Sequence, residues 1–243
     1  MEKITSLQNQ KVKAWAKLRE KKERDRTGLF LAEGPHLIEE ALRQGIVETV
    51  ITDGRYSFDG VQTVEAVPQV LKKLSASVSG VSCIAVCRQF ELPVKYPARV
   101  LLLDRIQDPG NFGTLIRTAV SFGFDAVYVS EDTCDLYNEK VIRSTQGAMF
   151  HIPVIRASLS DTVKALQKDG FRVFGTSLHN AVSMSEAQES EKMAFVMGNE
   201  GQGVSTAILD LCDQSMFIEI SGFESLNVAV AGGIIMYRYR GRR

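Results

Sequence analysis

Residues 100–129 read VLLLDRIQDPGNFGTLIRTAVSFGFDAVYV, and this stretch decides the fold class of the 243-residue chain. An apolar run (100–103) precedes a polar loop, an amphipathic stretch over 112–122 and a second apolar run over 126–129. The order predicts a strand, a helix and a strand. Because strands joined through a helix normally pair in parallel, the stretch predicts an α/β fold.

The same alternation continues toward the C terminus. Further strands are expected over 150–155, 171–175, 194–197 and 216–220, and helices over 162–168, 205–211 and 227–240. We therefore expect a parallel sheet with helices on both faces. Upstream of the proline-bounded stretch LPVKYPAR (92–99) lie shorter elements, beginning with a basic helix over 8–24. The chain is thus expected to divide into a small α/β domain, residues 1–95, and a larger one, residues 96–243.

Composition excludes several classes of protein. With 44% hydrophobic and 24% charged residues, the chain is neither disordered nor fibrous. It contains no run of about 18 apolar residues that would span a membrane. The start, MEKITSLQNQ, lacks the apolar core of a signal peptide, so a cytoplasmic protein is expected. In that compartment the four cysteines are expected to be reduced and buried.

Charge is balanced overall, with 29 basic and 29 acidic residues, but it is unevenly distributed. Residues 1–30 contain nine Lys or Arg and four Asp or Glu, and the tail YRYRGRR (237–243) adds four arginines. Two basic termini on a neutral chain favour contacts with phosphate groups. A solvated helix face and a simple charged tail remain the alternative.

Polar loops follow four of the expected strands. They read DRIQDPGNFG after residue 103, TSLHN after 175, GNEGQG after 197 and SGFESLN after 220. Parallel sheets bind ligands beyond the carboxyl ends of their strands. The four loops therefore predict a pocket at this edge that is lined largely by backbone.

Common nucleotide and metal motifs are missing from these loops. There is no P-loop sequence, and the glycines of 198–203 have the reverse of the dinucleotide-binding spacing. The segment 175–179 lacks the closing glycine of a nucleophile elbow. Cys83 and Cys87 would lie about 13 Å apart on one strand, too far for a shared zinc ion. No metal site is expected.

Three strings resemble the motifs of the SpoU/TrmH family of RNA ribose 2′-O-methyltransferases, part of the SPOUT group. They are DRIQDPGNFGTLIRTA (104–119), FVMGNEGQG (195–203) and IEISGFESLNVAVA (218–231), in the family's order and approximate spacing. The run from ITSLQN (4–9) to LAEG (31–34) is similar to the family's ribosomal-protein-like RNA-binding domain. One departure is Glu219, where the family often has proline.

The resemblance implies a fold, a cofactor and partners. The C-terminal domain is expected to be a SPOUT domain whose last segment forms a trefoil knot, which normal topology rules would not predict. The cofactor is expected to be S-adenosylmethionine and the substrate RNA, with ribosomal RNA favoured over transfer RNA. A homodimer formed through the C-terminal domain is also expected. Residues 1–95 would bind RNA and residues 96–243 would bind the cofactor.

Methyl transfer to a ribose hydroxyl is an in-line displacement, so the protein must align the reactants and help the hydroxyl lose its proton. The resemblance assigns this work to Asn111, Arg117, Glu200, Ser225 and Asn227. Arg117 is either a general base or an electrostatic clamp. We favour the clamp, because a guanidinium normally stays protonated. Asn111 could instead cap a helix, and Glu200 could be an ordinary solvated acid.

Two further sets of residues are expected to bind ligands. Cofactor contacts are assigned to residues of three loops, although the apolar ones could equally be core: Thr176, Ser177, Leu178, Gly198, Asn199, Gly201, Ile218 and Leu226. RNA phosphates are assigned to the basic residues of the N-terminal helix and to one distant arginine: Lys11, Lys13, Lys17, Arg19, Lys21, Lys22, Arg24, Arg26 and Arg143. Such contacts would position RNA without reading its sequence.

Two other functions remain open. The chain could be a catalytically silent RNA-binding or ribosome-assembly protein on the same scaffold, but such a protein would be free to lose Asn111, Arg117, Glu200 and Asn227. It could also methylate a base nitrogen, which the string SLNV (225–228) disfavours because it resembles the ribose-modifying branch.

Overall fold

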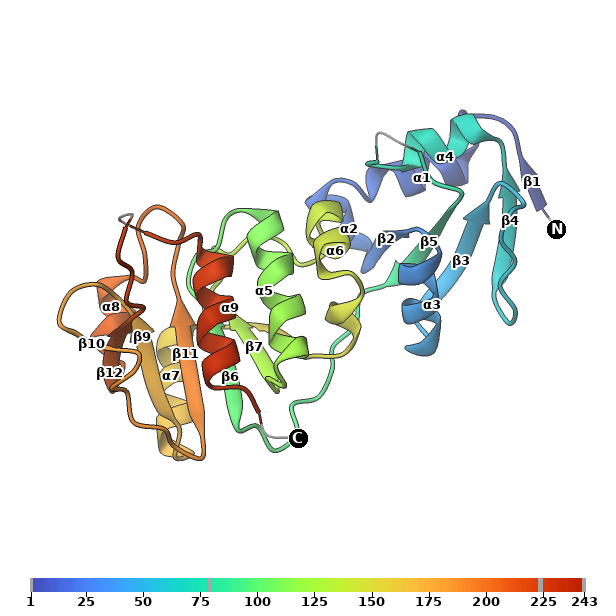
Figure 1. Ribbon diagram of the computed structural model, residues 1–243. Helices are drawn as coiled ribbons and strands as arrows, with labels where there is room; N and C mark the ends of the chain where they lie inside the picture. The colour runs from blue at the N-terminus through green and yellow to red at the C-terminus, as the bar shows by residue number, and fades with distance from the viewer. Residues whose placement is uncertain (1, 78–79, 223–224, 242–243) are drawn as a thin grey trace. The chain divides into compact units, whose positions relative to one another are not determined.

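The computed structural model describes residues 2–77, 80–222 and 225–241 (Figure 1). The chain forms two compact units, each containing one sheet. Unit 1 comprises Met1–Phe90 and Asp135–Phe150, and unit 2 comprises Glu91–Cys134 and His151–Arg243. The expected α/β class is confirmed in both units. The assignment of RNA binding to residues 1–95 and cofactor binding to residues 96–243 stays a prediction.

The sheet of unit 1 is mixed. Its strands are β1 (Glu2–Ile4), β2 (Leu29–Glu33), β3 (Val47–Thr52), β4 (Gln62–Ala66) and β5 (Cys83–Arg88), in the order β1-β4-β3-β5-β2. β1, β4 and β3 are parallel, and β5 runs antiparallel to both β3 and β2. The helices are α1 (Gln10–Lys17), α2 (Lys21–Thr27), α3 (Pro35–Arg43) and α4 (Pro68–Leu74).

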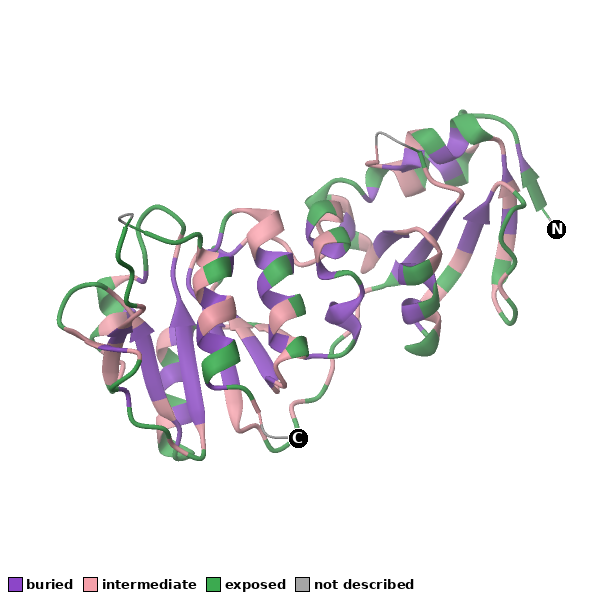
Figure 2. Ribbon diagram, viewed as in Figure 1, coloured by how far each residue is buried: buried purple, intermediate pink, exposed green. Residues whose placement is uncertain are grey.

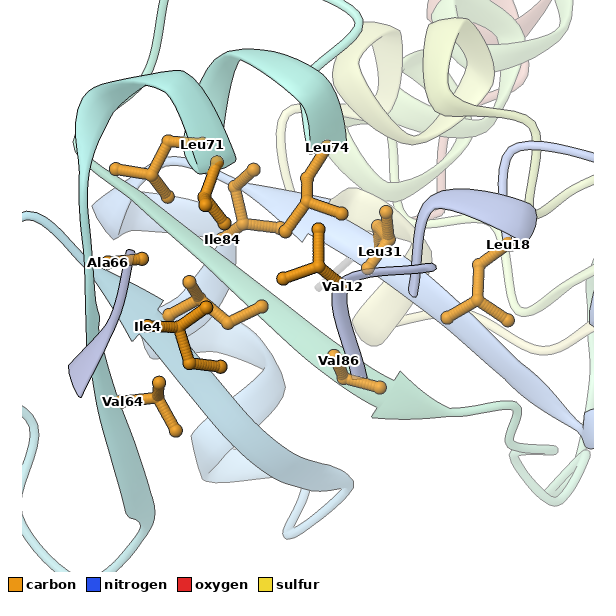
Figure 3. Packing of buried hydrophobic residues seen from close by; sticks show 12 residues of the cluster. Ile4, Val12, Leu18, Leu31, Val64, Ala66, Leu71, Leu74, Ile84 and Val86 are labelled. Carbon is orange, nitrogen blue, oxygen red and sulfur yellow. The ribbon is translucent and has the colours of Figure 1, made fainter. Parts of the chain in front are cut away.

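The helices α1 and α4 cover one face of this sheet. Val12 of α1 and Leu71 and Leu74 of α4 are buried against Ile84 and other strand residues (Figure 3). Apolar positions spaced by about one helical turn and alternate strand positions supply this cluster. The helix α3 contacts β2, β3 and β5.

Residues Asp135–Phe150 lie between two strands of unit 2 in the sequence but pack in unit 1. They contain α6 (Glu139–Thr145) and the 3₁₀ turn η1 (Ala148–Phe150). The ring of Tyr137 packs against that of Phe30 in a tilted arrangement, and its hydroxyl donates to Phe90 O at 2.9 Å and accepts from Phe90 N at 3.0 Å. Phe150 also stacks on Phe90. This excursion, which we call the arm, completes the core of unit 1.

The sheet of unit 2 is parallel throughout. Its strands are β6 (Arg99–Leu103), β7 (Ala126–Val129), β8 (Val154–Arg156), β9 (Arg172–Thr176), β10 (Ala181–Ser183), β11 (Met193–Met197) and β12 (Gln214–Phe217). They are arranged in the order β10-β12-β9-β11-β6-β7-β8. The central β11 is buried along its whole length (Figure 2).

Helices cover both faces of this sheet, as expected (Figure 1). One face carries α5 (Pro109–Ser121) and α9 (Val228–Arg238), which pack against each other. A Cβ on Gly232 of α9 would lie 2.4 Å from Leu115 Cδ2, so any larger residue there would force the buried Leu115 side chain to shift. The other face carries α7 (Leu159–Lys168) and α8 (Thr206–Leu209), whose apolar side chains pack on Val100 and Val196.

Several expected element bounds need correction. The helix expected over 8–24 is two helices, because the chain turns after Leu18. The strand expected over 150–155 is limited to Val154–Arg156, since Phe150 belongs to η1. The strand expected over 216–220 ends at Phe217. The helix expected from residue 112 begins at Pro109, which can occupy a first turn where its missing N–H has no helical partner.

The remaining expectations concern cysteines, membranes and metals. The four cysteines, all within the described residues, form no disulfide with one another. Cys83 and Cys87 are buried, as expected, but the expected burial is wrong for Cys134 and Cys212, which are only partly buried. Burial raises the pKa of the Cys83 thiol to about 11 and that of Cys87 to about 12, so neither is a ready nucleophile. Among the described helices, none combines the length and apolar character needed to cross a bilayer. The described residues hold no group of three His, Cys, Asp or Glu side chains arranged for a metal ion.

Candidate functional site

A cavity of about 660 Å³ lies at the carboxyl edge of the parallel sheet in unit 2. Its walls come from the loops after β9, β11 and β12, and from residues at the start of α9. These strands end at the same edge because they are parallel neighbours. The fold therefore brings together polar loops that lie up to 50 residues apart in the sequence.

All eight residues assigned to the cofactor line this one cavity, as do Glu200 and Ser225. Asn111, Arg117 and Asn227 do not line it. The sequence did not single out His179, Gln202 or Val228, which also contribute to the walls. The sequence could have indicated these three residues, because each lies beside an assigned residue in the loop strings TSLHN, GNEGQG and SLNV.

The loop 198–203, which we call the glycine loop, folds tightly back on itself. Asn199 and Gly203 exchange two backbone hydrogen bonds, of 3.0 and 2.9 Å. Asn199 Oδ1 accepts hydrogen bonds from the backbone N–H groups of Gly201 and Gln202, each 3.0 Å long. A Cβ on Gly198 would lie 2.0 Å from Val204 N, so any larger residue would open the loop. The loop is consequently a preformed wall with accessible backbone.

Glu200 joins the glycine loop to the start of α5. Its carboxylate accepts hydrogen bonds from Gln107 N at 3.2 Å, Asp108 N at 3.1 Å and Asn111 Nδ2 at 3.1 Å. Burial raises the pKa of Glu200, but the hydrogen bonds from Asn111 and from these backbone groups outweigh burial and lower it below the usual value. Glu200 is therefore an anion at neutral pH.

The hydrogen-bond chain continues from Glu200 to the start of α9. Asn227 Nδ2 donates to Asn111 Oδ1 at 3.0 Å, while Asn227 Oδ1 accepts from the N–H groups of Ala229 and Val230. Asn227 is thus the N-cap of α9. Asn111 does not cap α5, because Asp108 takes that role by accepting from Asn111 N at 2.8 Å. All three motifs therefore contribute residues to this connected set.

Arg117 lies apart from this set. It is exposed on α5, and its guanidinium has no hydrogen bond or ion pair with any part of the chain that the structure describes. Ser225 and Leu226 are exposed at the cavity and follow residues 223–224 of the third motif, which fall outside the described residues. The structure hence unites Asn111, Glu200 and Asn227 and leaves the Arg117 guanidinium available to a ligand.

The residues assigned to RNA fall into three groups in unit 1. Three are paired with nearby acids: Lys11 with Glu2, Lys21 with Asp25 and Arg26 with Glu23. Five are exposed and have no ion pair among the described residues: Lys13, Lys17, Arg19, Lys22 and Arg143. The ninth residue is Arg24. Of the basic tail, residues 242 and 243 are outside the described chain.

The assignment of Arg24 to RNA is wrong. Its side chain is 3% exposed and donates from Nε and Nη2 to Asp135 Oδ2, at 3.0 and 2.6 Å. Nη1 donates to the carbonyls of Leu18 and Arg19, at 2.8 Å each. Arg24 therefore fixes the turn between α1 and α2 and holds the arm, leaving no group free for a phosphate.

Comparison with known proteins gives matches over both regions of the chain. Residues 98–237 match the SpoU rRNA methylase family, and residues 9–85 match an MRM3-like substrate binding domain. The 23S rRNA (guanosine(2553)-2′-O)-methyltransferase RlmP of Bacillus subtilis is 42% identical over 248 residues, covering 99% of this chain and 100% of that protein.

Solved structures resemble the entire chain as well. An AdoMet-bound rRNA methyltransferase from Sinorhizobium meliloti has a TM-score of 0.89 and 28% identity, covering 98% of this chain and 97% of that one. The SpoU methyltransferase AviRb from Streptomyces viridochromogenes, in complex with AdoMet, has a TM-score of 0.84 and 28% identity, with coverage of 96% and 97%.

Proposed function

Because this chain belongs to the SpoU rRNA methylase family, we propose that it methylates the ribose 2′-hydroxyl of a guanosine in 23S rRNA, with S-adenosylmethionine as methyl donor. The full-length similarity to RlmP of Bacillus subtilis supports this substrate. The single structural observation that carries the proposal is the cavity built from the family's second and third motifs. The silent RNA-binding alternative gains no support.

The cavity fits S-adenosylmethionine. Its volume of about 660 Å³ is in the range that holds ligands of this size. Gly198 allows the chain to fold into a cradle that a Cβ would fill. Ile218 and Leu226 offer apolar surface for the adenine, and Thr176, Ser177 and Asn199 offer polar groups. When bound, the cofactor supplies an electrophilic methyl group on its sulfonium.

The chain's own residues would orient the acceptor ribose. Arg117 carries a guanidinium with no partner among the described residues, which can hold the substrate phosphate and stabilise negative charge on the 2′-oxygen as its proton leaves. Glu200 holds Asn111, and Asn111 holds Asn227, so the two amides have fixed orientations beside the cavity. Ser225 lines the same cavity and would donate or accept at the reacting centre.

RNA binding is proposed for unit 1. The match to a substrate binding domain over 9–85 supports this, as do the exposed basic side chains of α1, α2, the turn between them and the arm that have no ion pair within the described part of the chain. Replacing Lys13, Lys17, Arg19 and Lys22 together by alanine should weaken RNA binding and flatten its dependence on salt concentration, because fewer counterions are released. Unchanged affinity and salt dependence would refute this assignment.

The knot, the dimer and the location remain proposals too. Arg99 Nε donates to Tyr239 O, and Tyr239 Oη donates to Met184 O. These contacts of the residue after α9 with β6 and with the segment before β11 support a threaded C-terminal segment. Val230 and Tyr237 of α9 are 52% and 60% exposed, which supports a homodimer formed through this helix. A ribosomal RNA substrate supports a cytoplasmic location.

Mapping 2′-O-methylation in 23S rRNA from cells with and without this gene tests the function directly. We expect the loss of one methylated guanosine ribose, restored by the intact gene but not by a copy encoding Arg117→Ala. An identical methylation map in both cells would overturn the proposed substrate.

A further inference from the structure

Arg105, the second residue after β6, has an unusual backbone conformation. Its φ is 59°, in the left-handed region that residues with a Cβ rarely adopt. A strained residue persists when its surroundings hold it in place, and such residues concentrate at functional sites. The contacts of Arg105 show which part of the molecule this conformation holds in place.

Arg105 binds the glycine loop although it does not line the cavity. Its Nη1 donates to Gln202 Oε1 at 2.9 Å, and its Nη2 lies 3.5 Å from Gly203 O. Its carbonyl accepts a 2.9 Å hydrogen bond from Asn199 Nδ2. The backbone N–H donates to Ser130 Oγ at 2.8 Å, which anchors the residue on the loop after β7. Side chain and backbone of one residue thus hold both ends of the loop.

The preceding residue extends this contact. Asp104 is 4% exposed, and its Oδ2 accepts from Ser205 N at 2.8 Å. Its Oδ1 lies 3.3 Å from Arg105 Nε, which is buried without a hydrogen bond. An unsatisfied buried donor reduces stability. The left-handed backbone and this donor both reduce stability, and the ion pair with Asp104 offsets part of that loss. Fold stability alone therefore does not account for arginine at this position.

We propose that Arg105 is a positioning residue that fixes the glycine loop in the shape that receives the methyl donor. This rests on the proposed function of the cavity. Arg105 does not itself line the cavity, but the three glycine-loop residues to which it is hydrogen-bonded, Asn199, Gln202 and Gly203, all do. The wall that they form is set before the ligand arrives, so less ordering is required on binding.

Calorimetry with S-adenosylmethionine on the intact chain tests this role. Arg105→Gly removes the guanidinium and also relieves the left-handed strain, so its melting temperature should equal or exceed that of the unchanged protein. The dissociation constant should rise about tenfold, as expected for losing charge-assisted hydrogen bonds that hold the loop. Arg105→Lys keeps the charge but lacks the planar fork, and should recover only part of the affinity.

Arg156→Ala is the matched control. Arg156 also donates to loop carbonyls in unit 2, those of Ser130, Glu131 and Cys134, but it contacts no residue of the glycine loop. Its loss should leave the dissociation constant unchanged. In turnover assays Arg105→Gly should raise the KM for the donor and largely keep kcat at saturating donor.

Two results would overturn the role of Arg105: unchanged donor affinity in Arg105→Gly, or a loss of affinity matched by Arg156→Ala. If the unchanged protein takes up neither S-adenosylmethionine nor its demethylated product, the proposed function of the cavity fails, and the role of Arg105 fails with it. The behaviour of the unchanged protein therefore separates the two failures.

Discussion

Arg117 is an exposed cation on an otherwise well-packed helix. Because its side chain has no partner among the described residues, Arg117→Ala should change the free energy of unfolding by less than about 0.5 kcal/mol. If the guanidinium stabilises charge on the ribose oxygen, turnover should fall on the order of 100-fold or more, with donor binding intact. Single-turnover methylation assays and calorimetry measure the two effects.

Lys168→Ala is a suitable control for this experiment. Lys168 is exposed in the last turn of α7, and α7 and α5 lie on opposite faces of the sheet (Figure 1). Its removal should leave turnover as it was. Full activity in Arg117→Ala would remove arginine from the mechanism.

Glu200 should make stability depend on pH. Its folded pKa lies below the ordinary value of 4.5, so its hydrogen bonds stabilise the fold above about pH 4.5. This contribution is lost as the pH falls through the lower, folded pKa. Glu200→Gln should therefore lower the free energy of unfolding by about 1 kcal/mol at pH 7, a small value because the group is partly exposed. At acid pH the same substitution should lower it much less.

Urea unfolding at pH 7 and at a series of pH values descending from 4.5 measures the difference. Glu131→Gln, which changes an exposed acid in a neighbouring loop, should behave like the unchanged protein at each of these pH values. If Glu200→Gln lowered the free energy of unfolding equally at neutral and at acid pH, the ionised carboxylate would not be what stabilises the loops.

The sequence predicted many individual residues of the site and missed others. Residues after parallel strands must gather at one edge, so the sequence alone placed Gly198, Ile218 and Thr176 near each other. Arg105 was quoted within a motif but not singled out, because a positive φ at a residue other than glycine leaves no mark in the sequence. Arg24 was misassigned since its partner, Asp135, is 111 positions away.

At the scale of elements, the contact between α5 and α9 depends on one of two adjacent glycines. Gly232→Ala should destabilise the protein by about 2 kcal/mol, because the new Cβ would lie 2.4 Å from Leu115 Cδ2. Gly233→Ala should be neutral or stabilising by up to about 1 kcal/mol, since its Cβ would be 3.8 Å from Thr118 Cγ2 and alanine favours helix. Thermal unfolding of both variants compares them, and equal effects would contradict the observed packing.

Element prediction was most accurate where both local pattern and packing agree. The strands 100–103 and 126–129 and the helix between them are strongly apolar on their buried sides, and all three occur, although the helix begins three residues earlier than expected. The helix over 8–24 was predicted as continuous because its composition is helical throughout. The helix ends at Leu18 because the buried Leu18 side chain and the hydrogen bond from Arg24 to the Leu18 carbonyl hold the chain in a turn. The strands β1 and β10 were missed because three residues are too few to show a periodicity.

On the scale of the whole molecule, the arm should be stable only as long as unit 1 is. Leu71→Ala removes a buried side chain from the face of unit 1 covered by α1 and α4, and should destabilise that unit by about 3 kcal/mol. Amides of residues 139–145 should then exchange faster together with those of β2. Hydrogen exchange measured by mass spectrometry on the full chain resolves these segments.

Flanking strands of unit 2 provide the internal control. In Leu71→Ala, peptides covering β7 and β8, which border the arm in the sequence, should exchange their amide hydrogens as slowly as in the unchanged protein. If residues 139–145 instead kept their protection in Leu71→Ala, the arm would belong energetically to unit 2, despite its packing in unit 1.

The arm also affects how the protein is made. A nascent chain emerges from the ribosome in order, and domains commonly fold as soon as their residues are available. Here the first unit lacks Tyr137 and Phe150 until the chain has been synthesised well past residue 90, when β6, α5 and β7 are already exposed. Two incomplete cores therefore coexist during translation, and the N-terminal one is finished from within the sequence of the other.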